Sequence, residues 1–471
     1  MADTDILRVE NLNVWFQMRE GFFKDLLAKK QRYAKAVDGV SFNIKKGEIF
    51  CLVGESGCGK TTTGKGILRL IEPTSGSVIF ADEKEDKVMG DLIKSVEKTY
   101  ETEERIGKFA FFGSLFASLA TIAMSINLAL TIVNLGENEL VRILLGLACL
   151  FEAPILFASS RRYNRALKAI QEKTRAIITL EDGRPALDVR KLDRSELTYA
   201  RQRIQMIFQD PYESLNPKMT VFDIVAEPLV VNKICKNEKE KEDRVKKALN
   251  DAGLRPPEFF MWRYPHQVSG GQRQRVGIAG TLVLDPSLLV ADEPISMLDV
   301  SIRGDILKLM LDLRDKKRLT YLFITHDLSV AYVFSDRIGV MYLGRIVEMG
   351  PTEKIIKNPK HPYTQALITV VPKPDPTAKE EKIILKGERP DPTNIPKGCR
   401  FHPRCPYVME ICEHEQPAET EVEAGHWAEC FLLTPEIVDK WNKEWAVKKE
   451  EEKMKKITAP ITPKDKEKKK K

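Results

Sequence analysis

The sequence lacks several features that would assign it to common classes of protein. Residues 1–5 are acidic and run directly into a strand-like stretch, without the basic and apolar segments of a secretory signal peptide, so we expect none. The formal net charge is +7, and residues 440–471, with 13 Lys against 6 Asp or Glu, account for all of it. The rest of the chain has no net charge, which argues against a nucleic-acid-binding body. We also find no internal repeat.

The basic excess therefore belongs to a tail, residues 436–471. Such a charged run predicts a disordered, solvated segment. Weak attraction to anionic lipid headgroups is the alternative interpretation.

The 471 residues are too many for one compact domain. Apolar patterns predict strands at 6–9, 13–16, 40–44 and 48–53, a helix from 59 to 70, and a strand at 77–80. The same α/β pattern resumes at about 178 and continues to about 350. We interpret residues 1–80 and 178–350 as two parts of one α/β domain.

Residues 81–177 interrupt this domain with a different composition. No charged residue occurs from Phe109 to Gly136, a run long enough to cross a bilayer. A second apolar run, from Ile143 to Ser160, carries only Glu152. Basic residues bracket both runs, so both ends would face the cytoplasm. We expect an inserted helical transmembrane hairpin with stalk helices, and a soluble hairpin buried in protein is the alternative.

Residues 351–435 form an irregular, Pro-rich C-terminal domain with a cluster of four cysteines. These are Cys399, Cys405, Cys412 and Cys430. Without a secretory signal, clustered cysteines indicate metal binding more often than disulfides. Their spacing is not that of common paired zinc motifs, so spacing alone leaves tetrahedral Zn²⁺ and an iron–sulfur cluster both open.

A glycine-rich loop between a predicted strand and a predicted helix fits the phosphate-loop pattern. Its residues are Gly54, Glu55, Ser56, Gly57, Cys58, Gly59, Lys60, Thr61 and Thr62. Glycines allow backbone N–H groups to surround phosphates, and Lys60 adds positive charge at the β- and γ-phosphates. The Thr61 hydroxyl suits Mg²⁺. The motif predicts nucleotide binding.

A second motif is an apolar strand, residues 288–291, that ends in two carboxylates. Asp292 can hold Mg²⁺ through water, and Glu293 can orient or deprotonate the attacking water. A third motif, Ser269, Gly270, Gly271 and Gln272, precedes a helix and offers further N–H and hydroxyl groups to phosphate. Two phosphate-facing helix starts on one chain suggest that two chains meet around each nucleotide.

Together these motifs resemble the ABC ATPase family over residues 6–80 and 178–350. The resemblance implies a P-loop ATPase domain with a RecA-like core and antiparallel β and helical subdomains. It implies that Ser269–Gln272 complete the opposite subunit's site. It also implies that Gln209 is the Q-loop residue, which contacts Mg²⁺ and water, and that Asp299 and His326 are the D-loop and switch residues. For the aromatic that stacks on adenine, Tyr33 is our candidate and Phe16 the competitor.

The closest resemblance is to the oligopeptide/dipeptide importer branch, on the segments 208–217, 298–302 and 361–367 and the Cys cluster. It implies ATP and Mg²⁺ as ligands and a [4Fe-4S] cluster on the four cysteines. It also implies a homologous ATPase subunit in a head-to-tail dimer, two permease subunits and an external substrate-binding protein at the cytoplasmic membrane. This sequence departs from the family pattern at Gly280 and Thr281, where we expect the helix that follows Ser269 to be interrupted. The 81–177 insertion departs further.

The sequence therefore predicts the ATP-hydrolysing subunit of a peptide importer. An oligosaccharide importer would use the same motor. A soluble ABC ATPase acting on nucleic acid or ribosomes is a rival of another class, opposed by the neutral body and the apolar insertion. An exporter ATPase is a further rival, opposed by the Cys cluster.

Overall fold

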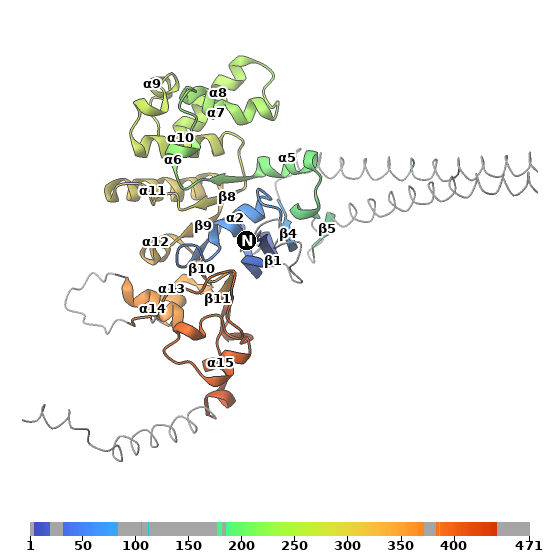
Figure 1. Ribbon diagram of the computed structural model, residues 1–471. Coiled ribbons are helices and arrows are strands. Elements are labelled where there is room, and N and C mark those ends of the chain that lie inside the picture. The colour runs from blue at the N-terminus through green and yellow to red at the C-terminus, as the bar shows by residue number, and fades with distance from the viewer. Residues whose placement is uncertain are drawn as a thin grey trace, which may run out of the picture.

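The computed structural model describes residues 4–18, 32–82, 105, 112, 177–180, 185–371, 383–385 and 387–439 (Figure 1). Nearly all of the predicted insertion and tail lie outside these ranges. Within the described ranges, no helix combines the length and the apolar character that a membrane span requires.

The central feature is an eight-stranded sheet in the order β12-β13-β11-β10-β3-β9-β8-β7. Five neighbouring strands run parallel: β3 (Ile49–Val53), β7 (Ile204–Ile207), β8 (Leu288–Asp292), β9 (Thr320–Thr325) and β10 (Arg337–Tyr342). They are short apolar runs that are buried almost throughout, as expected for parallel strands covered on both faces. The remaining strands are β11 (Arg345–Pro351), β12 (Glu419–Glu423) and β13 (His426–Glu429).

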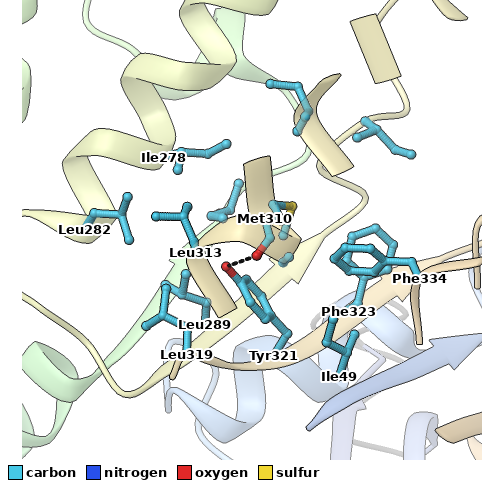
Figure 2. Packing of buried hydrophobic residues seen from close by; sticks show 14 of the residues in the cluster. Ile49, Ile278, Leu282, Leu289, Met310, Leu313, Leu319, Tyr321, Phe323 and Phe334 are labelled. Atoms are coloured by element: carbon cyan, nitrogen blue, oxygen red, sulfur yellow. Dashed lines mark hydrogen bonds between the residues drawn. The ribbon is translucent and has the colours of Figure 1, made fainter. Parts of the chain in front are cut away.

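Helices cover both faces of the parallel strands. On one face, α11 (Val300–Lys317) supplies Met310 and Leu313, which pack with Tyr321 and Phe323 of β9 (Figure 2). The Tyr321 hydroxyl donates a hydrogen bond to the Met310 carbonyl at 3.2 Å, so this buried polar group is satisfied. On the other face, α2 (Lys60–Ile67) lies close enough that a Cβ on Gly64 would come within 2.9 Å of Val290. The helix α12 (Leu328–Phe334) follows β9 and adds Phe334 to the core in Figure 2.

A second, antiparallel sheet has five strands in the order β2-β1-β4-β6-β5. They are β1 (Asp5–Gln17), β2 (Tyr33–Lys45), β4 (Ser75–Phe80), β5 (Ile177–Thr179) and β6 (Pro185–Asp188). The prediction of two strands before residue 17 was wrong, because β1 is one strand with an irregular register where Asn11 takes a positive φ of 48°. The α2 helix is also shorter than predicted, and it ends at Ile67. The helix α5 (Arg194–Arg203) leads from this sheet into β7.

A group of helices lies beyond the carboxyl end of β7 (Figure 1). It comprises α6 (Pro211–Ser214), α7 (Val221–Val231), α8 (Glu238–Asp251), α9 (Pro257–Met261) and α10 (Gly270–Leu282). The expected interruption of α10 was wrong, because the helix runs unbroken through Gly280 and Thr281. The Thr281 hydroxyl donates to the Ile278 carbonyl at 2.8 Å, so this buried hydroxyl finds its partner within the helix.

The C-terminal region contains α13 (Thr352–Lys357), α14 (Pro362–Val370), α15 (Glu410–His414), β12 and β13. It continues the main sheet, because β13 pairs with β11. Arg345 and Glu429 form a two-bond ion pair across this junction, and Arg400 bonds to Asp38 of β2. Four 3₁₀ turns complete the described elements: Val189–Lys191, Pro265–Gln267, His402–Arg404 and Phe431–Leu433.

Candidate active site

The predicted phosphate loop connects β3 to α2 and is held tightly against its neighbours. A Cβ on Gly54 would lie 2.2 Å from the Met341 carbonyl oxygen, and one on Gly59 would lie 2.1 Å from that of Ala36. Gly59 also has a positive φ of 111°. Only glycine fits both positions, so the backbone can follow the narrow path that presents its N–H groups.

Lys60 begins α2 and turns its ammonium group back under this loop. Its Nζ donates to the carbonyl oxygens of Gly54 at 2.7 Å and Glu55 at 3.0 Å, and the side chain is buried. The loop N–H groups, the helix N-terminus and this cation together favour a phosphate group.

Thr61 and Asp292 meet as the Mg²⁺ prediction requires. The Thr61 hydroxyl donates to the Asp292 carboxylate at 2.8 Å. Burial raises the pKa of the Asp292 carboxyl, although the Thr61 hydrogen bond opposes this shift. A hydroxyl and a carboxylate side by side are hard oxygen ligands of the kind Mg²⁺ prefers.

Glu293, Gln209 and His326 converge from three different strand ends. The Glu293 carboxylate lies 3.2 Å from Gln209 Nε2 and 3.1 Å from His326 Nδ1. Asp292 and Glu293 are adjacent on the chain but contact different partners. The convergence follows from the parallel sheet, because β7, β8 and β9 deliver these residues to the same carboxyl edge as the phosphate loop.

These groups surround one cavity of about 610 Å³. Its lining consists of Ala36, Gly54, Glu55, Ser56, Gly57, Gly59, Lys60, Thr61, Thr62, Gln209, Glu293, His326 and Leu367. The predicted phosphate-loop, Q-loop, water-activating and switch residues thus share one cavity. Cys58 is buried beside it, with Sγ 3.8 Å from Lys60 Nζ.

Other predicted residues lie elsewhere. Ser269 caps α10. Its hydroxyl accepts a hydrogen bond from the Gln272 N–H at 3.3 Å, and the side-chain carbonyl of Gln272 accepts one from the Ser269 N–H at 3.0 Å. This helix start and Asp299, which precedes α11, are not among the lining residues. The two aromatic candidates, Tyr33 and Phe16, are exposed on β2 and β1 and do not line the cavity either.

The sequence interpretation missed a set of contacts to the phosphate loop from the C-terminal region. The hydroxyl of Tyr363 accepts a hydrogen bond from the Glu55 N–H at 3.0 Å. Arg404 pairs with the Glu55 carboxylate through two bonds, at 2.8 and 3.1 Å. Arg389 donates to the Ser56 carbonyl. Tyr363 belongs to the 361–367 segment noted above, whereas nothing in the sequence pattern singled out either arginine.

The four cysteines of the C-terminal region are close enough to influence one another. Burial, together with the neighbouring thiols, raises the pKa of Cys399 and Cys430 to about 12 and of Cys405 to about 11. Cys399 N–H donates to the Cys412 carbonyl at 2.9 Å. Nevertheless, the part of the chain that the structure describes contains no group of three or more His, Cys, Asp or Glu side chains arranged to hold a metal ion.

Comparison with known proteins agrees with this geometry. Residues 37–118 and 166–296 match the ABC transporter family, and residues 347–412 match the oligopeptide/dipeptide transporter C-terminal region. The chain is 36% identical over 431 residues to the oligopeptide transport ATP-binding protein AppF of Bacillus subtilis, covering 91% of this chain and 98% of that protein. It is 37% identical over 407 residues to the putative oligopeptide transport ATP-binding protein YkfD of the same organism, covering 86% and 92%. It is 34% identical over 431 residues to the dipeptide transport ATP-binding protein DppF of Haemophilus influenzae, covering 92% and 98%.

The chain therefore belongs to the ABC transporter ATP-binding family and has the P-loop ATPase fold. Within that family it belongs to the branch that carries the oligopeptide/dipeptide transporter C-terminal region. It is an ATP-binding protein and an ABC-type ATPase.

Proposed function

We propose that this chain is the ATP-hydrolysing subunit of an importer that takes up dipeptides or oligopeptides across the cytoplasmic membrane. The observation that carries the proposal is the single cavity that joins the phosphate loop to Gln209, Glu293 and His326, in a chain with a peptide-transporter C-terminal region. The names of AppF, YkfD and DppF support peptides as the substrate class.

In this proposal the phosphate loop binds the nucleotide, and oxygen ligands next to the loop would hold Mg²⁺. The N–H groups of residues 54–62 and Lys60 take the phosphates. Thr61 and Asp292 hold Mg²⁺, and their 2.8 Å contact supports the pairing. The metal ion would neutralise charge that develops during phosphoryl transfer.

Glu293 takes the role of the group that positions and deprotonates the attacking water. Gln209 and His326 orient its carboxylate through contacts at 3.2 and 3.1 Å. As the water oxygen forms a bond to the γ-phosphorus, the bond to the β-bridging oxygen breaks and ADP leaves. Lys60 and His326 stabilise the negative charge on the transferring group.

A second, homologous ATPase subunit would complete the site with its signature residues. The support is that Ser269–Gln272 lie outside this chain's own cavity, at a helix start where Ser269 is exposed and available to a partner's nucleotide. Gln209 leads into α6, where Tyr212 stacks under Arg273 of α10, with 4.1 Å from the guanidinium to the ring centre. This path would carry closure of the dimer to two permease subunits, which receive substrate from an external binding protein.

The test of the proposed function is uptake in a strain that lacks this chain. Without its motor subunit the importer has no energy source, so uptake of radiolabelled dipeptides and oligopeptides should fall to background. The wild-type chain should restore it, whereas a Lys60→Met chain should not. Labelled oligosaccharides serve as the control substrates. Loss of oligosaccharide uptake with unchanged peptide uptake would assign the motor to a sugar importer and overturn the proposal.

We also propose that the insertion at 81–177 is a membrane anchor for the motor. The uncharged run from 109 to 136 between basic residues motivates this proposal. The strands at its two ends support a hairpin, because Phe80 and Ile177 both pair with Leu187, from opposite sides of β6. The two ends therefore lie about 10 Å apart, which is two strand spacings. This short separation is what a helical hairpin needs, because it leaves the domain and returns close to where it started. Extraction of membranes with alkaline carbonate is the decisive measurement.

We further propose that Cys399, Cys405, Cys412 and Cys430 hold a [4Fe-4S] cluster. The donor set would be these four thiols: burial, and to a lesser extent the neighbouring thiols, raises the pKa of Cys399 and Cys430, and thiolate ligands would bind the iron atoms. Chain purified without oxygen should contain about four iron atoms and as many sulfides. Cys405→Ser should lose most of the iron. Cys235→Ser, a change at a half-buried cysteine outside this group, should keep it. Stoichiometric zinc would indicate the Zn²⁺ alternative, and chain free of both metals would refute a metal site.

A further inference from the structure

Side chains of the C-terminal region form hydrogen bonds and an ion pair with the phosphate loop. Glu55 is the centre of this contact: its N–H donates to the Tyr363 hydroxyl, and its carboxylate accepts two bonds from Arg404. The next residue, Ser56, is held through its carbonyl by Arg389. Two consecutive loop residues are thus tied to three side chains that lie more than 300 positions further along the chain.

Two of these three side chains, Tyr363 and Arg404, are themselves firmly placed. Tyr363 is fully buried, and its ring lies 4.7 Å from that of Tyr342 and 5.4 Å from that of Phe401, centre to centre. The side chain of Arg404 is 9% exposed, against 29% for Glu55. A planar guanidinium with two bonds to one carboxylate fixes direction as well as distance. The loop is therefore positioned by groups with little freedom of their own.

This positioning matters because the loop itself is rich in glycine. Glycines let the backbone adopt the phosphate-binding path but also let it leave that path at little cost. Contacts that remove this freedom before ATP binds should raise the affinity for ATP, because less conformational entropy is then lost on binding. Glu55 contributes no positive charge or hydroxyl to phosphate, so its side chain is better explained by its bond to Arg404 than by contact with the nucleotide.

We propose that the Glu55–Arg404 pair positions the phosphate loop for ATP, so that nucleotide affinity depends on the C-terminal region. This inference rests on the proposed ATP site. Because linkage is reciprocal, ATP bound to the loop also stabilises the segment 399–412, which begins and ends with cysteines and contains Arg404. The pair thereby joins the nucleotide site to the segment 399–412, which carries three of the four cysteines, with Glu55 and Arg404 as positioning residues.

The test is a double-mutant cycle on the full chain with a fluorescent ATP analogue. Glu55→Gln and Arg404→Met should each weaken ATP binding about tenfold. The double variant should be no worse than either single change, because both remove the same contact. Arg345→Met is the matched control. It breaks the Arg345–Glu429 pair, which is also a two-bond arginine–carboxylate pair and joins β11 to the C-terminal region, but whose two residues lie outside the loop. It should leave ATP affinity within twofold.

Hydrogen exchange gives a second measurement that a purely structural role would not change. ATP should slow exchange of backbone amides in 399–412 in the wild-type chain and in Arg345→Met, but not in Glu55→Gln. If Arg345→Met and Arg404→Met weakened ATP binding equally, general loss of structure would explain the effect, and the inference would be overturned. Strictly additive single changes, or unaltered affinity, would overturn it as well. Failure of the wild-type chain to bind ATP would instead refute the proposed function.

Discussion

Replacing Glu293 by Gln should lower ATP hydrolysis about a thousandfold while leaving ATP binding nearly intact. The amide has the size and shape of the carboxylate but cannot accept a proton from water, and general-base catalysis typically contributes about 10²- to 10⁴-fold. ATP binding should survive because the phosphate contacts belong to the loop and Lys60. Release of inorganic phosphate measures the turnover, and a fluorescent ATP analogue measures the binding.

The surroundings of Glu293 make this substitution informative. One of its carboxylate oxygens faces Gln209 and the other faces His326, so the side chain is held on both sides and is only 14% exposed. Glu353→Gln is the control: it removes a carboxylate that pairs with Lys357 on the surface, and hydrolysis should not change. Turnover by Glu293→Gln within about tenfold of wild type would remove Glu293 from its proposed role and direct attention to His326.

The central part of the fold and of the site could be predicted because it depends on local sequence. A buried parallel strand is a short apolar run, and a phosphate loop or a carboxylate pair directly follows such a run. The sheet then brings the strand ends together without any further information in the sequence. Gln209, Glu293 and His326 lie 84 and 33 positions apart along the chain and still meet through this rule.

Long-range side-chain pairs could not be predicted in this way. Arg404 and Arg389 are ordinary arginines in an irregular segment, and only the folded chain brings them to Glu55 and Ser56. Strand limits were also missed where the backbone deviates locally. At Asn11 a positive φ and a shift of register allow one strand to continue where the apolar pattern predicted two. Tyr33 stays a prediction for adenine stacking, since it is exposed at the start of β2.

Removing residues 84–175 should release the chain from membranes that otherwise retain it. The proposed reason is that the apolar runs inside this segment span the bilayer, and insertion of a transmembrane helix is effectively irreversible in aqueous washes. Chain expressed without any permease should remain in the pellet after alkaline carbonate, whereas the shortened chain should appear in the wash. Flotation in a sucrose gradient separates membrane-bound chain from aggregates, which do not float.

The limits of this deletion follow from the structure at the base of the insertion. Asp82 must stay, because it forms a buried ion pair with Arg203 at 2.8 Å and also bonds to Ser287. Removing one partner of such a pair typically costs about 3–5 kcal/mol. This is a large part of the about 5–15 kcal/mol that stabilises a typical domain, and such a loss would confuse the result. A linker of about four glycine and serine residues spans the gap of about 10 Å between β4 and β5.

The shortened chain should still bind ATP, since Arg203 and Ser287 directly precede β7 and β8, and these two intact strands lead to the site. Loss of ATP binding would mean that the deletion damaged the domain, and a second deletion with a longer linker would then be compared. If the full and the shortened chains both bind ATP and both wash off the membranes, the insertion is no integral anchor. Attachment to the membrane would then depend entirely on the permeases.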